Sequence, residues 1–125
     1  MELTLHRAED HHFIRSVSDG GFHINELEYE GAIIVSATRV IPSWATESIA
    51  GLTETLLQPI FDLEPEIVLL GTGRDQSFPA PSLMMSFYRR GIGVEAMTTH
   101  AACRTFNVLM SERRNAVAAM LPAGA

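Results

Sequence analysis

Apolar residues in the second half of the chain form short runs that are separated by stretches of helical periodicity. The runs at residues 67–70, 93–97 and 116–121 are typical of strands buried on both faces. Between them, residues 83–88 and 102–110 repeat apolar side chains at three- and four-residue steps, as one face of a helix does. Strand–helix–strand units of this length form right-handed crossovers, so the pattern predicts a parallel β-α-β-α-β arrangement.

Both predicted helices have ends that the sequence marks. Ser82 is expected to cap the first helix, and Arg89-Arg90-Gly91 to end it with positive charge followed by glycine. Thr98 or Thr99 is expected to cap the second helix, which Arg113-Arg114 closes. The residues predicted to be buried are Leu83, Met84, Phe87 and Tyr88 in the first helix and Ala102, Cys103, Phe106, Leu109 and Met110 in the second.

We expect residues 1–10 to form an extended or loosely ordered lead-in. The rest of the first half alternates apolar and polar residues over short segments, which predicts antiparallel strands. Residues 12–18 and 22–25 flank the turn signal Asp19-Gly20-Gly21, which predicts a β-hairpin. Residues 27–30 alternate again and predict a further short strand.

A mostly apolar run at residues 32–36 predicts a central strand, which we expect residues 38–41 to extend until Pro42 ends it. Trp44 follows, and it could anchor the crossover onto the sheet or mark a contact surface; packing is the preferred interpretation.

Residues 52–63 have the period of a helix. Pro59 removes a backbone donor from any helix interior, so we expect the helix to start near Thr55 and to carry the proline in its first turns.

Composition places the chain among globular proteins. With 125 residues, of which 46% are hydrophobic and 19% charged, it is predicted to be a single domain over residues 1–125. The formal net charge of −6 argues against nucleic acid as a partner, because phosphate contacts need a basic face. The nine residues in the lysine-plus-arginine total are all arginines, which excludes Schiff-base and P-loop lysine chemistry.

The cysteine content and the N-terminal residues favour a cytoplasmic location. The single cysteine, Cys103, rules out an internal disulfide and fits a reducing compartment. The first residues lack the basic start and apolar core of a signal peptide. No apolar run approaches the roughly 20 residues needed to span a bilayer, so we do not expect membrane insertion.

A candidate site lies where the parallel strands end. Gly71-Thr72-Gly73 follows a buried strand, as in a dinucleotide-binding fingerprint, but Gln76 stands where that fingerprint has its third glycine. A tight turn is therefore the preferred interpretation. Ligands of open parallel sheets still sit beyond the carboxyl ends of the strands. The candidate ligand-binding residues near that edge are Gly71, Thr72, Gly73, Arg74, Thr98, His100, Arg104 and Asn107, with Thr99 beside them.

Other reactive side chains fit structural roles at least as well as chemical ones. Arg104 and Asn107 lie off the apolar face of their helix, where either could bind an anion or brace a loop. His100 and Cys103 have the spacing of a base and a nucleophile, but Cys103 falls on the apolar face, where cysteine packs as a small hydrophobe. The histidines at positions 6, 11, 12 and 23 lack the spacing of metal ligands. No metal, cofactor or catalytic residue is predicted.

Several motifs, taken in order, resemble those of a known family. They are Leu69-Leu70-Gly71-Thr72-Gly73, Gly91-Ile92-Gly93-Val94-Glu95-Ala96-Met97, the run from Ala101 to Leu109, Glu112-Arg113 and an alanine-rich last strand. The chain resembles a family of small bacterial and archaeal proteins of unknown function, to which the mitochondrial respiratory complex I assembly factor three is similar. The signature positions of this family here are Gly71, Gly73, Arg104, Thr105 and Asn107, and Phe106 stands where tyrosine is common.

The resemblance implies a bacterial protein with a compact three-layer α/β fold. Its mixed central sheet would have a parallel C-terminal β-α-β-α-β portion and additional antiparallel N-terminal strands. The resemblance also implies a non-enzymatic assembly or protein-interaction factor that works through a protein partner.

An alternative from the residues is a binding protein or enzyme for an anionic small molecule, using Thr72, Arg74, His100 and Arg104 in a pocket beside the glycine turn. A self-associating structural protein is a third hypothesis, based on the apolar composition. The identity of the partner, that of the ligand and the oligomeric state do not follow from the sequence.

Overall fold

The computed structural model describes residues 11–46 and 48–125, so the predicted lead-in at residues 1–10 lies outside the described residues. The described strands form a three-stranded sheet in the order β1-β2-β3 and a five-stranded sheet in the order β5-β4-β8-β6-β7. The elements are β1 (Ile14–Val17), β2 (Gly21–Ile24), β3 (Leu27–Glu30), β4 (Ile33–Val35), β5 (Val40–Pro42), α2 (Glu54–Phe61), β6 (Ile67–Gly71), α3 (Pro81–Arg89), β7 (Gly93–Met97), α4 (Thr99–Ser111) and β8 (Ala116–Met120).

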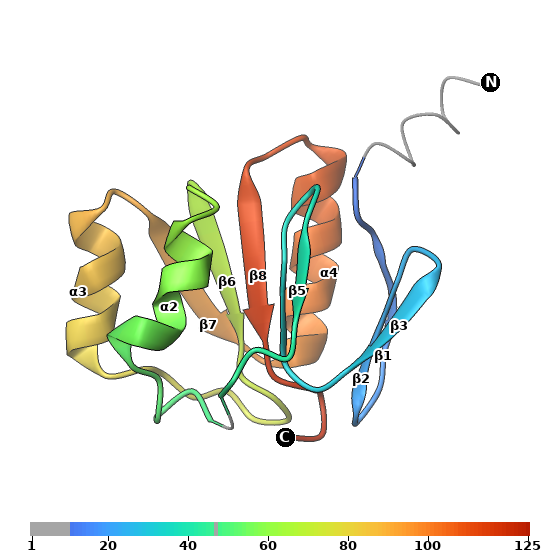
Figure 1. The fold of residues 1–125 in the computed structure, drawn as a ribbon, viewed down its shortest axis with the longest axis horizontal. Helices are drawn as coiled ribbons and strands as arrows, with labels where there is room; N and C mark the ends of the chain where they lie inside the picture. Colours follow the sequence, from blue (N-terminus) through green and yellow to red (C-terminus); the bar gives the residue numbers. More distant parts are fainter. Residues whose placement is uncertain (1–10, 47) are drawn as a thin grey trace.

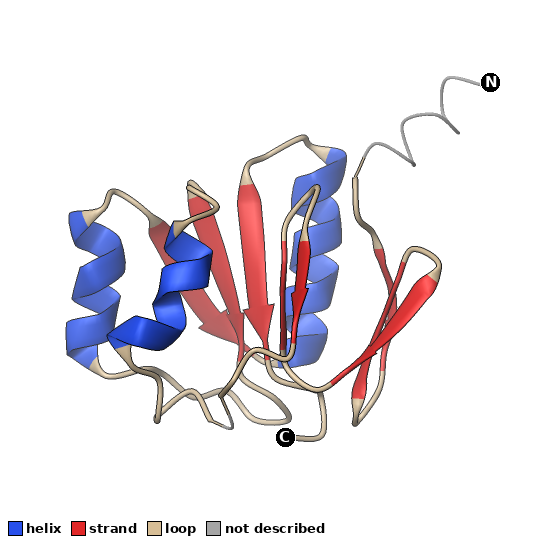
Figure 2. Cartoon of the chain, in the orientation of Figure 1, coloured by secondary structure: helices blue, strands red, loops and turns tan. Residues whose placement is uncertain are grey.

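The elements are arranged in layers on the two faces of the five-stranded sheet (Figures 1 and 2). Helices α2 and α3 cover one face, where Leu57 and Phe87 are fully buried. Helix α4 and the three-stranded sheet cover the other face, where Phe106 packs in the same cluster as Phe22. The predicted three-layer α/β fold with a mixed central sheet is confirmed.

The parallel half of the five-stranded sheet also follows the prediction. Strand β6 pairs in parallel with β7 on one side and with β8 on the other, in register from Ile67 to Gly71. Strand β8 is buried along its whole length. Because elements cover both faces of β8, apolar side chains stand at every position of this strand rather than at alternate ones.

The hairpin predicted around Asp19-Gly20-Gly21 is confirmed, and β3 extends it to a third antiparallel strand. Asn25 takes the positive φ of 50° that a two-residue hairpin turn favours at its first central position. Gly21 has to be glycine, because a Cβ there would collide with the carbonyl oxygen of Tyr29 on β3.

The prediction that residues 38–41 extend the preceding strand is wrong. The chain reverses after β4, where the Ser36 N–H donates to the Arg39 carbonyl oxygen at 2.8 Å and the Ser36 hydroxyl accepts from the Thr38 and Arg39 N–H groups. Strand β5 then runs back along β4 as the edge of the sheet. Pro42 is the last residue of β5, so a strand ends there as predicted, and the proline fits because an edge strand has an outer side where no ladder donor is needed.

Helix α2 begins at Glu54, next to the predicted start, and the Thr53 hydroxyl caps it by accepting from the Leu56 N–H. Pro59 lies inside the helix, where it removes a backbone donor. The predicted packing of Trp44 is confirmed, since this side chain is buried and its indole N–H donates to the Leu56 carbonyl oxygen at 2.9 Å.

The predicted cap of helix α3 and part of its buried face are wrong. Ala80 stands at the N-cap and Pro81 at the first helical position, so Ser82 lies inside the helix. Tyr88 is 53% exposed, and Ser86 is buried on this helix instead. The Ser86 hydroxyl accepts from the Arg90 guanidinium at 2.8 Å, which gives the buried hydroxyl the partner that it needs.

Candidate functional site

The carboxyl ends of β6, β7 and β8 meet at one edge of the sheet, where Gly71 lies in register with Met97 and with Met120. Helix α4 starts at the same edge, and the Thr98 hydroxyl caps it by accepting from the Ala101 N–H at 3.3 Å. The predicted site residues that the fold brings to this edge are Gly71, Thr72, Gly73, Arg74, Thr98 and His100. The other two, Arg104 and Asn107, lie more than one turn further along α4.

Thr99, whose side chain is 0% exposed, ties the segments of this edge together. Its hydroxyl donates to the Leu121 carbonyl oxygen at 2.7 Å and accepts from the Gly73 N–H at 2.9 Å. The Thr99 N–H donates in turn to the Gly73 carbonyl oxygen at 3.0 Å. Gly71 carries no side chain because a Cβ there would lie 3.1 Å from the Thr99 hydroxyl and 2.7 Å from the Met120 side chain.

The loop after β6 is held by its own polar side chains. The Thr72 hydroxyl donates to the Asp75 carbonyl oxygen at 2.7 Å and accepts from the Ser77 N–H at 3.3 Å. Gln76 donates from Nε2 to the Ala96 carbonyl oxygen at 2.9 Å. Gln76, which stands where a fingerprint glycine would be, therefore anchors the loop to the edge strand β7.

The segment after β8 fills the space beyond this edge. The Leu121 N–H donates to the Gly71 carbonyl oxygen at 2.9 Å, and the Arg74 N–H donates to the Ala125 carbonyl oxygen at 3.0 Å. Gly73 has a φ of +95°, and a Cβ there would lie 2.5 Å from the same Ala125 oxygen, so only glycine fits. The N–H groups of Gly73 and Arg74, which an anion would need, are thus both bonded within the chain.

Residues 121–125 also connect the edge to the small sheet. The Ala123 N–H donates to the Ser18 carbonyl oxygen at 3.3 Å, and the Gly124 N–H donates to the Asp19 carbonyl oxygen at 3.1 Å. A Cβ at Gly124 would lie 2.8 Å from the Cβ of Asp19. The connection of residues 121–125 to the turn between β1 and β2 was not predicted from the sequence. Gly124, after the last predicted strand, was the one residue that could have indicated such a close contact.

Of the remaining predicted site residues, three have exposed side chains, and the fourth, Asn107, is hydrogen-bonded to β1. The side chains of Arg74, His100 and Arg104 are exposed, and ligand binding by them stays a prediction. Asn107 accepts from the Ile14 N–H at 2.9 Å through Oδ1 and donates from Nδ2 to the Ile14 carbonyl oxygen at 2.8 Å. Because this amide faces both backbone groups of one residue, it takes the place of a neighbouring strand along the outer edge of β1.

Cys103 packs as a buried hydrophobe on the inner face of α4, and its thiol is 3.8 Å from the Met120 sulfur. Burial raises the pKa of the Cys103 thiol from 9.0 to about 12, and the neighbouring Arg104 charge opposes this shift without offsetting it. A thiol with this pKa stays protonated at neutral pH, and so it is a poor nucleophile.

Cys103 is expected to resist alkylation by iodoacetamide at pH 8 in the folded protein and to react readily in urea. The same shift predicts that stability falls as the pH rises from 9.0 toward about 12, because the unfolded thiol loses its proton first and the folded state then holds more protons. Mass spectrometry of the alkylated protein, with and without urea, measures the first effect. Rapid labelling of the folded protein would contradict the burial of this thiol.

Within residues 11–46 and 48–125, no three histidine, cysteine, aspartate or glutamate side chains gather so as to hold a metal ion. His12, one of the histidines considered above, lies with Nδ1 at 2.8 Å from the Ser36 carbonyl oxygen.

A family model described as a protein of unknown function (DUF498/DUF598) matches residues 14–121. The chain belongs to this family. The resemblance inferred from the glycine turn, the β7 motif and the α4 motif is therefore confirmed, and the matched residues include every candidate site residue named above.

The chain is similar to a bacterial protein and to an animal protein. The chain is 33% identical over 116 residues to a Francisella tularensis protein named "13 kDa major membrane protein", covering 92% of this chain and 94% of that one. It is 35% identical over 111 residues to NADH dehydrogenase (ubiquinone) 1 alpha subcomplex assembly factor 3 of Danio rerio, covering 87% of this chain. The match spans 63% of that relative, which is less than two thirds of its length.

A crystal structure of a Bordetella parapertussis protein shares the fold, with a TM-score of 0.83 and 37% identity over 92% of this chain and 98% of that one. This structure agrees with the mixed α/β architecture described above.

None of the described helices is both long enough and apolar enough to cross a membrane.

Proposed function

We propose that the protein is a non-enzymatic assembly or interaction factor that acts in the cytoplasm by binding another protein. The observation that carries the proposal is the identity of 35% with an assembly factor of the mitochondrial respiratory chain, which extends over 87% of this chain. The aligned part covers nearly the whole fold described here, so the proposal concerns what this domain itself does.

The strand edge gives no support to the alternative of an anionic small-molecule pocket. Two backbone donors at that edge, the N–H groups of Gly73 and Arg74, are bonded to Thr99 and to Ala125, and the Arg74, His100 and Arg104 side chains of that alternative are exposed. Residues 121–125 pass over the edge and continue to the turn between β1 and β2. The backbone groups joined by these hydrogen bonds therefore stabilise the fold.

Exposed apolar side chains on the outside of the molecule support protein binding. Among residues 11–46 and 48–125, six large apolar side chains are exposed, and Leu27 and Phe78 are the most accessible of them, at 61% and 62%. The six are Phe13, Leu27, Phe78, Met85, Tyr88 and Val108. Scattered apolar residues are common on protein surfaces. These six side chains therefore support protein binding only in combination with the similarity to an assembly factor.

Affinity capture of the tagged protein from its native cells tests the proposal. We expect the tagged protein in the cytoplasmic fraction, together with one defined protein that is recovered in every repeat and is missing from a tag-only control. Chemical crosslinking before lysis should retain the same partner. Repeated capture without a defined protein partner, or recovery of the tagged protein in the membrane fraction alone, would overturn the proposal.

A further inference from the structure

Within the part of the chain that the structure describes, the three-stranded sheet has one edge that other elements cover and one edge that no further strand pairs with. Along β1, the Asn107 amide bonds both backbone groups of Ile14, and β1 packs beside α4. Strand β3 forms the opposite edge, and among the described strands it pairs with β2 alone. The edge available to another chain is therefore β3.

The strand register identifies which backbone groups of β3 face outward. The Gly31 N–H donates to the Gly20 carbonyl oxygen at 2.9 Å, so the pair directly after Glu30 is hydrogen-bonded. Because hydrogen-bonded and non-hydrogen-bonded pairs alternate along an antiparallel ladder, Glu30 and Glu28 stand at non-hydrogen-bonded positions. Their N–H and C=O groups consequently point away from β2, toward the open edge.

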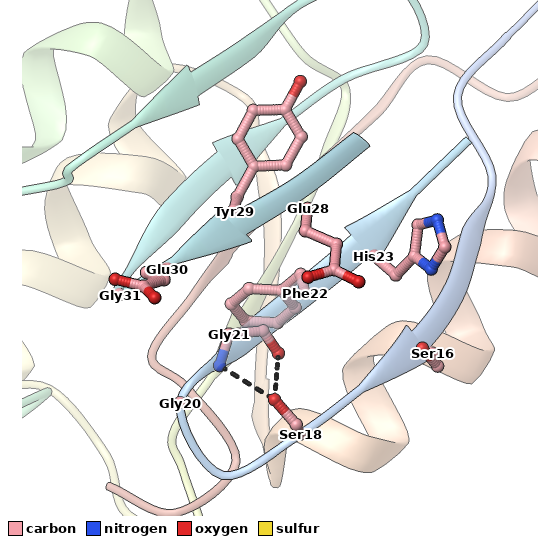
Figure 3. Close-up of a pocket in the computed structure, with 10 residues that line it drawn as sticks. All are labelled: Ser16, Ser18, Gly20, Gly21, Phe22, His23, Glu28, Tyr29, Glu30 and Gly31. Carbon is pink, nitrogen blue, oxygen red and sulfur yellow. Dashed lines mark hydrogen bonds between the residues drawn. The ribbon is translucent and has the colours of Figure 1, made fainter. Parts of the chain in front are cut away.

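A groove of about 650 Å³ lies on the three-stranded sheet beside these positions (Figure 3). Gly20 and Gly21 contribute no side chains to it, and Figure 3 shows the Glu28 carboxylate among the groove residues with the Tyr29 ring directed away from them. The polar side chains that line the groove are Ser16, Ser18, His23, Glu28 and Glu30. A long cationic side chain laid across β3 would find oxygen acceptors and open space there.

Strand β3 presents a pattern with alternating chemistry. Glu28 and Glu30 are exposed, and among the described residues neither carboxylate has a cationic partner, since Arg15 pairs instead with Glu26 at 3.6 Å. Leu27 is 61% exposed and lies on the opposite face of the strand from the two glutamates. A neighbouring strand that matched this pattern would carry cationic side chains opposite the glutamates and apolar ones between them.

We propose that β3 is the docking edge for an extended, basic segment of a partner protein. The segment adds antiparallel to β3, places arginine or lysine side chains opposite Glu28 and Glu30, and directs them toward the groove. A second copy of this chain is disfavoured as the occupant, because pairing of two β3 strands brings acidic side chains together. The inference rests on the proposed function, since it names the surface that a protein partner uses.

Fluorescent peptides test the inference directly. The probe is a heptapeptide with the sequence Thr-Val-Arg-Val-Arg-Val-Thr, compared with a version that has glutamate in place of both arginines. A third version carries methyl groups on the backbone nitrogens of both arginines, which keeps the charges and blocks antiparallel pairing. We expect only the first peptide to bind, with chemical-shift changes and slowed hydrogen exchange at the Glu28 and Glu30 amides.

The double variant Glu28→Lys/Glu30→Lys should weaken binding of the arginine peptide by about tenfold or more and should favour the glutamate peptide. The matched control is Glu95→Lys, an exposed glutamate on the edge strand β7 of the other sheet, which should leave peptide binding unchanged. Equal thermal melting of the variants and the wild type confirms that each of them folds.

Several results would overturn the inference. They are binding of the methylated or the glutamate peptide as tightly as the arginine peptide, unchanged affinity in the double variant, and no binding of any peptide up to about 1 mM. Dimerisation in sedimentation that the double variant abolishes would assign β3 to a second copy instead. If the captured partner described above is recovered equally with the double variant, the proposed function stands and the docking edge is refuted.

Discussion

Replacement of Thr99 by valine is expected to lower the free energy of unfolding by about 2–4 kcal/mol, although valine keeps the shape of the side chain. The Thr99 hydroxyl donates to the Leu121 carbonyl oxygen and accepts from the Gly73 N–H, and it does both without exposure to solvent. Removing it leaves these two backbone groups without partners, and each costs free energy because water cannot replace the hydroxyl. Urea unfolding followed by circular dichroism measures the loss.

Two companion variants separate the hydrogen bonds of Thr99 from the rest of its contribution. Thr99→Ser keeps the hydroxyl and should cost about 1 kcal/mol, the contribution of a buried methyl group. Thr105→Val makes the same chemical change at a half-buried position of the same helix and should change stability by less than about 0.5 kcal/mol. If Thr99→Val costs no more than Thr105→Val, the hydroxyl does not hold this edge together.

The parallel half of the fold could be predicted because its signals are local and agree with one another. Strand β8 is apolar at every position, since both of its faces are covered, and that continuous run is visible in the sequence. The inner face of α4 repeats at helical spacing, from Ala102 to Met110. The glycine turn after β6 likewise marked the carboxyl edge of the sheet correctly, because Gly71 and Gly73 are required there by close contacts.

The mistakes occurred where one side chain or a distant contact decides the local structure. The reversal after β4 depends on the Ser36 hydroxyl, which accepts hydrogen bonds from two N–H groups further along the chain. Because extended character continues past Ser36 in the sequence, the segments on both sides of it were predicted to form one strand. At the start of α3, Pro81 took the first helical position, and the familiar capping residue Ser82 therefore fell inside the helix.

The candidate site shows the same limit on a larger scale. Thr72, Gly73 and Thr98 could be predicted from the sequence to lie at the carboxyl edge of the sheet. The return of residues 121–125 over that edge could not be predicted. That contact joins Ala125 to Arg74, two residues that are far apart in the chain, and no periodicity reports it. The open edge at β3 could not be predicted from the sequence either, because it follows from the order of the strands in the folded sheet.

Replacement of Asn107 by leucine is expected to cost about 2–3 kcal/mol and to loosen the three-stranded sheet more than the central one. The Asn107 amide is bonded to the N–H and the C=O of Ile14, which lies in β1 and is 3% exposed. Leucine has a similar shape but no polar atom, so both backbone groups lose their partner. Hydrogen exchange should accelerate at the β1 and β2 amides before it does at those of β6 and β8.

An Asn107→Asp variant tests whether the donated hydrogen bond matters by itself. The introduced carboxylate can still accept from the Ile14 N–H, but it faces the Ile14 carbonyl oxygen with no hydrogen to donate. Folding therefore favours the protonated acid and raises its pKa, so the variant should regain stability as the pH falls through that raised pKa.

The matched control for Asn107 is Asn115→Leu, at an exposed asparagine that donates to the Glu64 carbonyl oxygen at 2.9 Å. Its loss should cost less than about 1 kcal/mol, because water can take over the exposed partner. Equal costs for the two leucine variants, or uniform acceleration of exchange through both sheets, would show that Asn107 does not hold the edge of β1. The contrast between a covered β1 edge and an open β3 edge would then lose its basis.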